Sequence, residues 1–341
     1  MPTKDSDLLD KIAGAFVAAP LKSNFLEFAD CYVQLCIDQG RDKSEALDVM
    51  QELFGAVEEQ STNPYLFSSL HIPTKEDESF FELGLKVAKP LVLNEPTIIN
   101  PHILNHVQEL LARGENVIFA ANHQTELEPQ ILSIACDSLA KDLFKNTFFV
   151  AGERVTTDPM AAPLSRGRRL FCIYAKRYVS DDKDVEVDRR MHNLKTIKQM
   201  KELLNRGGTC IYVALGGGRD RPDADRNVQL TPFDPSSVGL FTLLAQTSKQ
   251  PTHIFPLVIS SFNVLPPPVA VQKELGERRW TKGGRVTVAL GEEFVYAPFL
   301  KIEDKESMHH QLTQALFQQL RDLYTPYAGD VAPIPPRKAV N

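Results

Sequence analysis

The sequence predicts an α/β fold, in which a small N-terminal helical bundle precedes a larger, mixed and mostly parallel sheet covered by helices. Two observations lead to this prediction. Apolar residues recur at helical spacing through residues 6–60, where strand signals are few. From about residue 75 to residue 300, short apolar runs alternate with helical patterns. We therefore expect two domains, a helical bundle at residues 1–75 and an α/β domain at residues 76–341.

The elements follow from these patterns in chain order. The first region predicts three or four helices. Strands are expected where short apolar runs occur, at residues 89–93, 116–121, 147–151, 170–175, 209–215, 253–260 and 286–290. The charged tract at residues 180–208 predicts an amphipathic helix, and the residues expected to face inward are Met191, Leu194, Ile197 and Leu204. A last helix is expected from Lys305 to Tyr324.

The composition is that of an ordinary globular protein. The 341 residues are 43% hydrophobic and 24% charged, and the formal net charge of −6 argues against bulk binding of nucleic acid. Five scattered cysteines lack metal-type spacing, which indicates a reducing compartment and no structural zinc. We find neither a secretory signal pattern nor an apolar run of about 18 residues, so a soluble protein is expected.

A histidine follows one predicted strand. The strand at 116–121 leads directly to His123, and Glu128 stands five positions further on. A histidine beside a carboxylate is a candidate general base. The strand at 209–215 leads in the same way into a glycine-rich loop, and parallel strands would bring both loops to one edge of the sheet, where such folds bind ligands. The alternative is that this lone histidine is structural.

Cations gather after the predicted strands. They are Arg154, Lys176, Arg177, Arg219 and Arg221. Two arginines on either side of one aspartate can turn both guanidiniums toward one anion, while Gly217 and Gly218 let the backbone approach it. The competing interpretation is a local network of salt bridges.

Several segments together resemble a known family. They are NHQTELEP, VAGERVTTDPMAAPLSRGRRLFCIYAKR, ALGGGRDRPD and PFDPSSV, and they are similar to the soluble, plastid-type glycerol-3-phosphate 1-O-acyltransferases, with relatives in chlamydia-like bacteria. The likeness spans most of residues 75–300. It implies a small helical bundle joined to an α/β domain, in agreement with the boundary expected from periodicity.

The resemblance also assigns roles to residues. His123 fills the histidine of the family's H-x-x-x-x-D motif, and Glu128 stands where the family has aspartate. Arg219 and Arg221 match the phosphate-binding arginines. The family's Lys-His pair falls on Arg177 and Tyr178, which keeps the charge and loses the imidazole. With Lys176 as an alternative to Arg177 for the phosphate, Tyr178, Arg154, Gly217 and Gly218 are expected to line the site.

The reaction implied is direct acyl transfer to the 1-hydroxyl of glycerol 3-phosphate, which gives 1-acyl-sn-glycerol 3-phosphate. His123 would act as general base without a covalent intermediate, and no metal, redox or nucleotide cofactor is implied. The donor would be acyl carrier protein or acyl-CoA. A basic surface for an acidic carrier is expected among Arg166, Arg168, Arg169, Lys273, Arg278 and Arg279.

The resemblance further implies a bacterial cytoplasmic or mature plastid stromal enzyme. It would have no nucleic-acid partner, and it would touch a membrane only peripherally, on product release. Three alternatives stay open. One is a lysophosphatidate acyltransferase, the second is a silent phosphometabolite- or carrier-binding module, and the third is a phosphatase or nucleotide enzyme, for which a Walker loop is missing.

Overall fold

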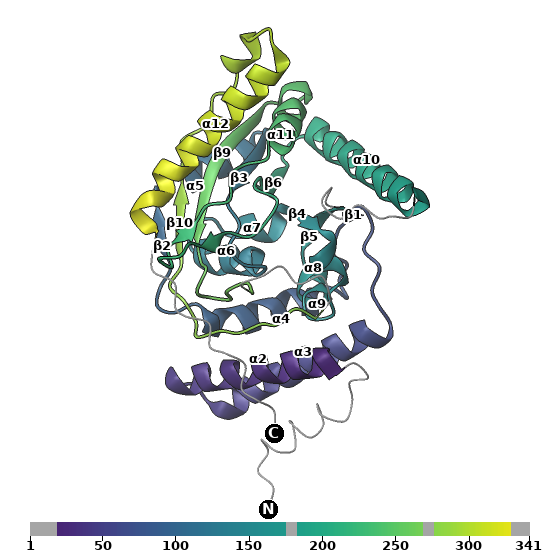
Figure 1. Cartoon of the computed structure of the whole chain (residues 1–341), viewed down its shortest axis with the longest axis vertical. Coiled ribbons are helices and arrows are strands. Elements are labelled where there is room, and N and C mark those ends of the chain that lie inside the picture. Colours follow the sequence, from purple (N-terminus) through teal and green to yellow (C-terminus); the bar gives the residue numbers. More distant parts are fainter. Residues whose placement is uncertain (1–18, 175–182, 269–275, 329–341) are drawn as a thin grey trace, which may run out of the picture.

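The computed structural model describes residues 19–174, 183–268 and 276–328, and its centre is an eight-stranded sheet (Figure 1). The strands of this sheet are β1 Leu70–His71, β2 Thr97–Ile99, β3 Asn116–Ala121, β4 Phe148–Gly152, β5 Arg169–Ile173, β6 Cys210–Ala214, β9 Thr252–Ser260 and β10 Thr287–Leu290. Their order is β1-β5-β4-β6-β3-β9-β10-β2. A separate hairpin pairs β7 Arg221–Pro222 with β8 Val228–Gln229.

The sheet is mixed and mostly parallel, which confirms the predicted fold class. The five central strands β5, β4, β6, β3 and β9 run parallel to one another. Edge strand β1 is antiparallel to β5, and β10 is antiparallel to β9 while β2 lies parallel to β10. All the carboxyl ends of the five central strands therefore meet at one edge of the sheet.

Six of the seven predicted strands are present, and the prediction for residues 89–93 is wrong. There the chain forms a 3₁₀-helix, η1 Lys89–Leu91, followed by a single bridge from Val92 to Gly284. Pro90 favours this turn because proline fixes φ and cannot donate to a strand ladder. Strands β1 and β2 are not predicted, because they have only two and three residues and carry no strand pattern.

Helices cover both faces of the sheet. They are α2 Ala19–Asp38, α3 Lys43–Thr62, α4 Glu78–Ala88, α5 His102–Ala112, α6 Glu128–Cys136, α7 Leu143–Asn146, α8 Glu153–Thr157, α9 Ala162–Arg166, α10 Lys183–Arg206, α11 Pro235–Thr247 and α12 Lys305–Tyr324, with short η2 Phe299–Lys301 and η3 Thr325–Tyr327. Aspartates at the N-caps of α3, α11 and α12 accept hydrogen bonds from main-chain N–H groups of the first turn. The last helix thus spans the residues predicted for it.

The two large clusters of the core lie on opposite sides of the sheet. All six residues of β3 are buried, as expected for a strand covered on both faces. Phe119 and its alternate neighbours pack in a cluster shared with α2 to α6, whereas Ile118 and Ala120 pack in a cluster with α10, α11 and α12. Helices α2 and α3 lie side by side beneath α4 (Figure 1). The division at residue 75 stays a prediction.

The expected inward face of α10 is only half right. Leu204 is fully buried, but Met191 is 60% exposed and Leu194 is 51% exposed. In this part of the helix the inward face is polar, because the Thr196 hydroxyl donates to the Cys172 carbonyl oxygen at 2.9 Å and the neighbouring turn bonds the end of β5. The spacing of apolar residues predicts the helix, but it does not show that the polar face of the helix forms hydrogen bonds with the end of β5.

Candidate active site

His123 and Glu128 form a hydrogen-bonded pair where β3 ends. The His123 Nδ1 atom lies 2.9 Å from Glu128 Oε2. The glutamate side chain is 3% exposed, while the histidine side chain is 28% exposed. No hydrogen bond to Nε2 occurs among residues 19–174, 183–268 and 276–328. The imidazole is thus held on one side by a buried carboxylate and turns its other side toward solvent.

Local structure explains how the longer carboxylate fits. Glu128 is the first residue of α6, and its Oε1 atom accepts hydrogen bonds from the main-chain N–H groups of Gln124 at 2.5 Å and Thr125 at 3.2 Å. The side chain folds back over the turn that leads into its own helix. The position also favours a negative charge, since it lies at a helix N-terminus.

Tyr212 of β6 completes the shell around the carboxylate. Its hydroxyl donates to Glu128 Oε2 at 2.9 Å. Burial, and then the neighbouring charge of Glu128, raises the pKa of Tyr212 well above its usual value, so the phenol remains a donor. The two carboxylate oxygens therefore meet three donors besides the histidine, and Glu128 acts as an acceptor toward Nδ1.

A backbone hydrogen bond joins the histidine to the arginine-bearing loop. The Asp220 N–H donates to the His123 carbonyl oxygen at 2.5 Å. The Asp220 side chain is buried, accepting from Asn122 Nδ2 at 2.9 Å and from the Thr231 N–H at 2.8 Å. Burial raises the pKa of Asp220 to about 6 against the lowering effect of these hydrogen bonds. Arg219 and Arg221 flank this anchor, so the structure brings the two predicted loops together.

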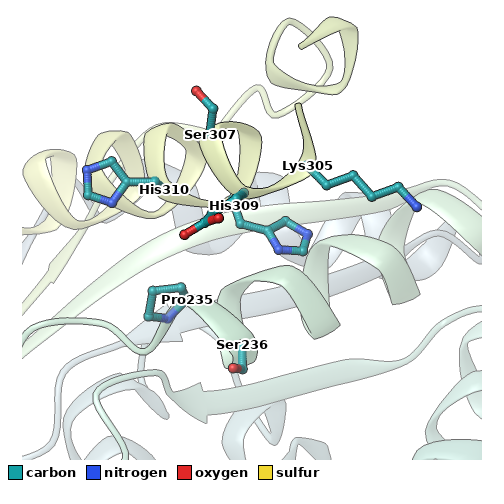
Figure 2. Close-up of a pocket in the computed structure, with 7 residues that line it drawn as sticks. Pro235, Ser236, Lys305, Ser307, His309 and His310 are labelled. Carbon is teal, nitrogen blue, oxygen red and sulfur yellow. The ribbon is translucent and has the colours of Figure 1, made fainter. Parts of the chain in front are cut away.

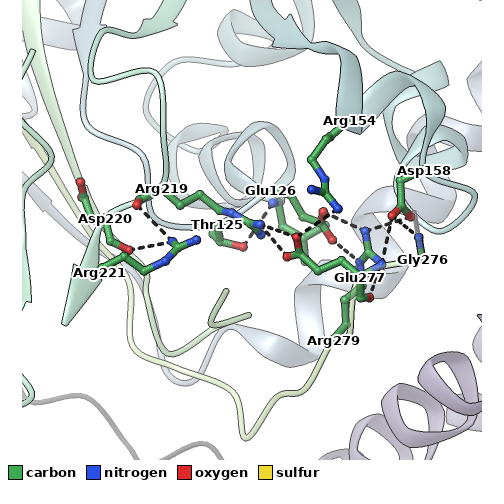
Figure 3. A network of polar contacts seen from close by, with 11 residues as sticks. Thr125, Glu126, Arg154, Asp158, Arg219, Asp220, Arg221, Gly276, Glu277 and Arg279 are labelled. Atoms are coloured by element: carbon green, nitrogen blue, oxygen red, sulfur yellow. Dashed lines mark hydrogen bonds and ion pairs between the residues drawn. The ribbon is translucent and has the colours of Figure 1, made fainter. Parts of the chain in front are cut away.

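The two arginines have different partners (Figure 3). Arg219 Nη2 lies 2.5 Å from Glu277 Oε1 and 2.8 Å from Oε2. Arg221 Nη1 donates to the carbonyl oxygens of Arg219 and Asp220, at 3.1 and 3.2 Å, and within the described ranges it forms no ion pair. Arg154, at the start of α8, lies 3.9 Å from Glu277.

Glycines shape the start of this loop. Gly217 has φ 64°, in the left-handed region that other residues seldom adopt, and Gly218 follows it directly before Arg219.

Three further predicted site residues, Lys176, Arg177 and Tyr178, lie outside the described residues.

The basic surface expected for an acidic carrier is wrong at two of its six positions, and a third, Lys273, lies outside the described residues. Arg168 and Arg279 are buried, at 1% and 5% exposure. Arg166 pairs with Asp77 at 2.6 Å and Arg278 pairs with Glu27 at 2.5 Å. These guanidiniums serve ion pairs and the core, which a count of basic residues in a sequence cannot reveal.

Sequence reasoning missed Tyr212, Asp220 and Glu277. Tyr212 lies inside an apolar strand run, where nothing in the sequence distinguishes it, and Glu277 is 58 residues from its partner Arg219. Only Asp220 had a signal, since it stands between the two arginines.

A pocket of about 560 Å³ lies away from this site, between the first turns of α11 and α12 (Figure 2). His309 and His310 line it together with Lys305. Gln124, next to His123, contacts the Tyr324 hydroxyl at the far end of α12. His310 and Tyr324 are thus about 21 Å apart along the helix axis. The pocket is not part of the His123 site.

The matching family model places the site in a class. A model described as Acyltransferase matches residues 102–260, the segment that holds the His123–Glu128 pair and the arginine-bearing loop. The fold and this match define the chain as an acyltransferase. In the described part of the chain no helix is both long and apolar enough to span a membrane.

Comparison with individual relatives shows which family of acyltransferases the chain belongs to. A chloroplastic glycerol-3-phosphate acyltransferase of Phaseolus vulgaris is 31% identical over 320 residues, which are 92% of this chain and 69% of the relative. Two chloroplastic glycerol-3-phosphate acyltransferases of Cucurbita moschata are 32% identical over 283 residues (82% of this chain, 60% of the relative) and 30% identical over 320 residues (91% and 70%). The chain belongs to the family of the chloroplastic glycerol-3-phosphate acyltransferases, as the motifs predicted.

Proposed function

We propose that the chain transfers a fatty acyl group from an acyl thioester to the 1-hydroxyl of glycerol 3-phosphate. The observation that carries this proposal is the His123–Glu128 pair, joined to the Arg219–Arg221 loop by the hydrogen bond from Asp220 N to His123 O. A base and a cationic loop held together in this way suit an acceptor that carries both a hydroxyl and a phosphate. The names of the relatives support the same acceptor.

His123 is the general base of the proposed reaction. Because Glu128 accepts the Nδ1 proton, the Nε2 lone pair is left to take the proton of the acceptor hydroxyl. The hydroxyl oxygen forms the new C–O bond with the thioester carbonyl carbon, and the C–S bond then breaks. The imidazolium returns its proton to the leaving thiolate, so no covalent enzyme intermediate forms. Glu128 stabilises the imidazolium in between.

The phosphate is bound by the arginine-bearing loop in this proposal. Arg221 presents a guanidinium that is half-buried and bonded only to main-chain oxygens within the described ranges, so its charge is available to an anion. Arg219 stands two residues away on the other side of Asp220. Fixing the phosphate orients the hydroxyl against Nε2, and orientation supplies a large share of the rate gain.

The test is acyl transfer to glycerol 3-phosphate, with acyl carrier protein and CoA thioesters compared as donors. We propose that the enzyme acts in the plastid stroma or the bacterial cytoplasm, where both thioester donors are water-soluble. His123→Ala should lower kcat by about 10²–10⁴-fold, the range of general-base catalysis. His253→Ala is the matched control, since His253 also pairs with a glutamate at 2.8 Å but sits at the start of β9. Full activity of His123→Ala would overturn the proposal.

The acceptor separates this function from its nearest rival. We expect acylation of glycerol 3-phosphate in the absence of detergent. Acylation of lysophosphatidate with no reaction on glycerol 3-phosphate would assign a lysophosphatidate acyltransferase instead. Binding of glycerol 3-phosphate without turnover from either donor would assign a silent binding module.

A further inference from the structure

Arg219 already holds an anion of the protein itself. Its Nη2 atom contacts both carboxylate oxygens of Glu277, and the two side chains are 16% and 6% exposed. Arg154 approaches the same carboxylate to 3.9 Å from a different direction (Figure 3). A carboxylate therefore lies between two arginines at the place where the proposed function needs a phosphate.

The backbone of Glu277 is fixed independently of this ion pair. The N–H groups of Gly276 and Glu277 donate to Asp158 Oδ2 at 2.7 and 3.2 Å. Arg279 Nη1 donates to the Glu277 carbonyl oxygen at 2.8 Å, and Arg279 is itself paired with Asp158 and Glu126. The Glu277 side chain can therefore turn away from Arg219 without moving the segment that carries it.

Two anions cannot share Arg219 at low cost. A phosphate on its guanidinium would lie against the Glu277 carboxylate, and like charges in a poorly hydrated site repel strongly. Arg154 offers the displaced carboxylate a second cation to turn toward, because it already lies 3.9 Å from Glu277 and approaches it from a different direction than Arg219 (Figure 3). Binding of phosphate and release of the carboxylate are thus coupled.

We propose that Glu277 is the resident counter-ion of Arg219, and that the phosphate of the acceptor displaces it toward Arg154. This inference rests on the function proposed above and deepens it. Only an acceptor with sufficient negative charge can make the exchange, so a neutral polyol leaves Arg219 paired with Glu277. The Arg219–Glu277 ion pair would thus make the site selective for phosphorylated acceptors over neutral ones.

The experiment is calorimetric binding of glycerol 3-phosphate, with inorganic phosphate as a second probe, to the full chain and to Glu277→Gln. Glutamine keeps the volume and removes the competing charge, so binding should tighten roughly three- to tenfold. The matched control is Glu27→Gln, which removes the ion pair of the neighbouring Arg278 and should leave the Kd unchanged. Should the glutamine variant fail to fold, Glu277→Asp, whose carboxylate stops about 1.5 Å short of Arg219, must also tighten binding.

A thermodynamic cycle identifies the partner. In an Arg219→Ala background the change from Glu277 to Gln should alter the Kd by less than about twofold, since the contact is already lost. Weaker binding by Glu277→Gln would mean that the carboxylate orients Arg219 and would overturn the exchange, as would no change. If the wild type binds neither probe, the proposed function fails as well. If the wild type binds and turns over glycerol 3-phosphate while Glu277→Gln binds no more tightly, only the exchange is wrong and the proposed function stands.

Discussion

Substitution of Glu128 by glutamine tests how the histidine is prepared for catalysis. The amide oxygen of the new side chain must face the N–H groups of Gln124 and Thr125, because the NH₂ group there would meet two donors. The NH₂ group then faces His123 Nδ1. That nitrogen can form a hydrogen bond only as an acceptor, so the proton moves to Nε2. The base is held in the wrong tautomer.

The size of the effect follows from two losses. An imidazolium and a carboxylate about 4 Å apart attract by about 4 kcal/mol at an effective dielectric constant near 20. Restoring the productive tautomer opposes two donors, which costs roughly 1–2 kcal/mol. Together they raise the barrier by about 5 kcal/mol, so kcat should fall by about 10³–10⁴-fold. Glu128→Asp keeps the carboxylate that accepts the Nδ1 proton and only shortens the side chain by one methylene. Its kcat should therefore fall less than that of the glutamine variant.

The assay is single-turnover acyl transfer with saturating glycerol 3-phosphate, which isolates the chemical step from acceptor binding. Glu293→Gln is the matched control. Its carboxylate lies 2.8 Å from His253 Nδ1, a similar contact far from the site, and the variant should keep full activity. A Glu128→Gln variant that melts like the wild type and keeps kcat within about tenfold would refute the reasoning about the tautomer.

Two further predictions concern the arginine-bearing loop. Arg221→Ala should raise the KM for glycerol 3-phosphate by roughly tenfold or more with kcat little changed. The control is Arg226→Ala, on the exposed part of the loop, which should leave the KM unchanged. If Arg221→Ala and the wild type give the same saturation curve, Arg221 does not contact the phosphate. Asp220, with its pKa raised to about 6, binds its proton more tightly in the folded state, so its stabilising contribution is complete below its unfolded pKa and is lost as the pH rises through about 6. The wild type should therefore lose up to about 2–3 kcal/mol of unfolding free energy relative to Asp220→Asn between roughly pH 4 and pH 7, measured by urea unfolding, and a constant difference would contradict this.

The sheet was predictable where burial on both faces leaves an unmistakable apolar run. Strands β3 and β6 are such runs, and the polar residues that follow them mark the edge where ligands bind. Strands of two or three residues have no such signature, and a run that contains Pro90 can satisfy its backbone in a 3₁₀ turn instead. Local sequence reveals burial better than it reveals pairing.

The site was predictable only where its residues are neighbours in the chain. His123 and Glu128 are five positions apart, and Arg219 and Arg221 are two apart, so each pair was visible as a motif. The partner of Arg219 is set by the fold, which holds the backbone of Gly276 and Glu277 against Asp158, directly after α8. An ion pair between distant residues depends on packing, and no spacing rule indicates it.

The residues on either side of His123 fix the geometry of the site. Asn122 donates to Asp220 Oδ2 and to the Ile259 carbonyl oxygen at 2.9 and 3.0 Å, and it accepts from the Ile259 N–H at 2.9 Å. Gln124 Oε1 accepts from the two main-chain N–H groups that follow β9, at 2.8 and 2.9 Å. These amides bond backbone groups just where the sheet hydrogen bonds stop, and leaving such groups unpaired when buried is costly. Asn122 joins the histidine turn to the aspartate between the arginines. The proposed proton acceptor and the proposed phosphate site are therefore held together at the end of the sheet, which would fix the orientation of the acceptor.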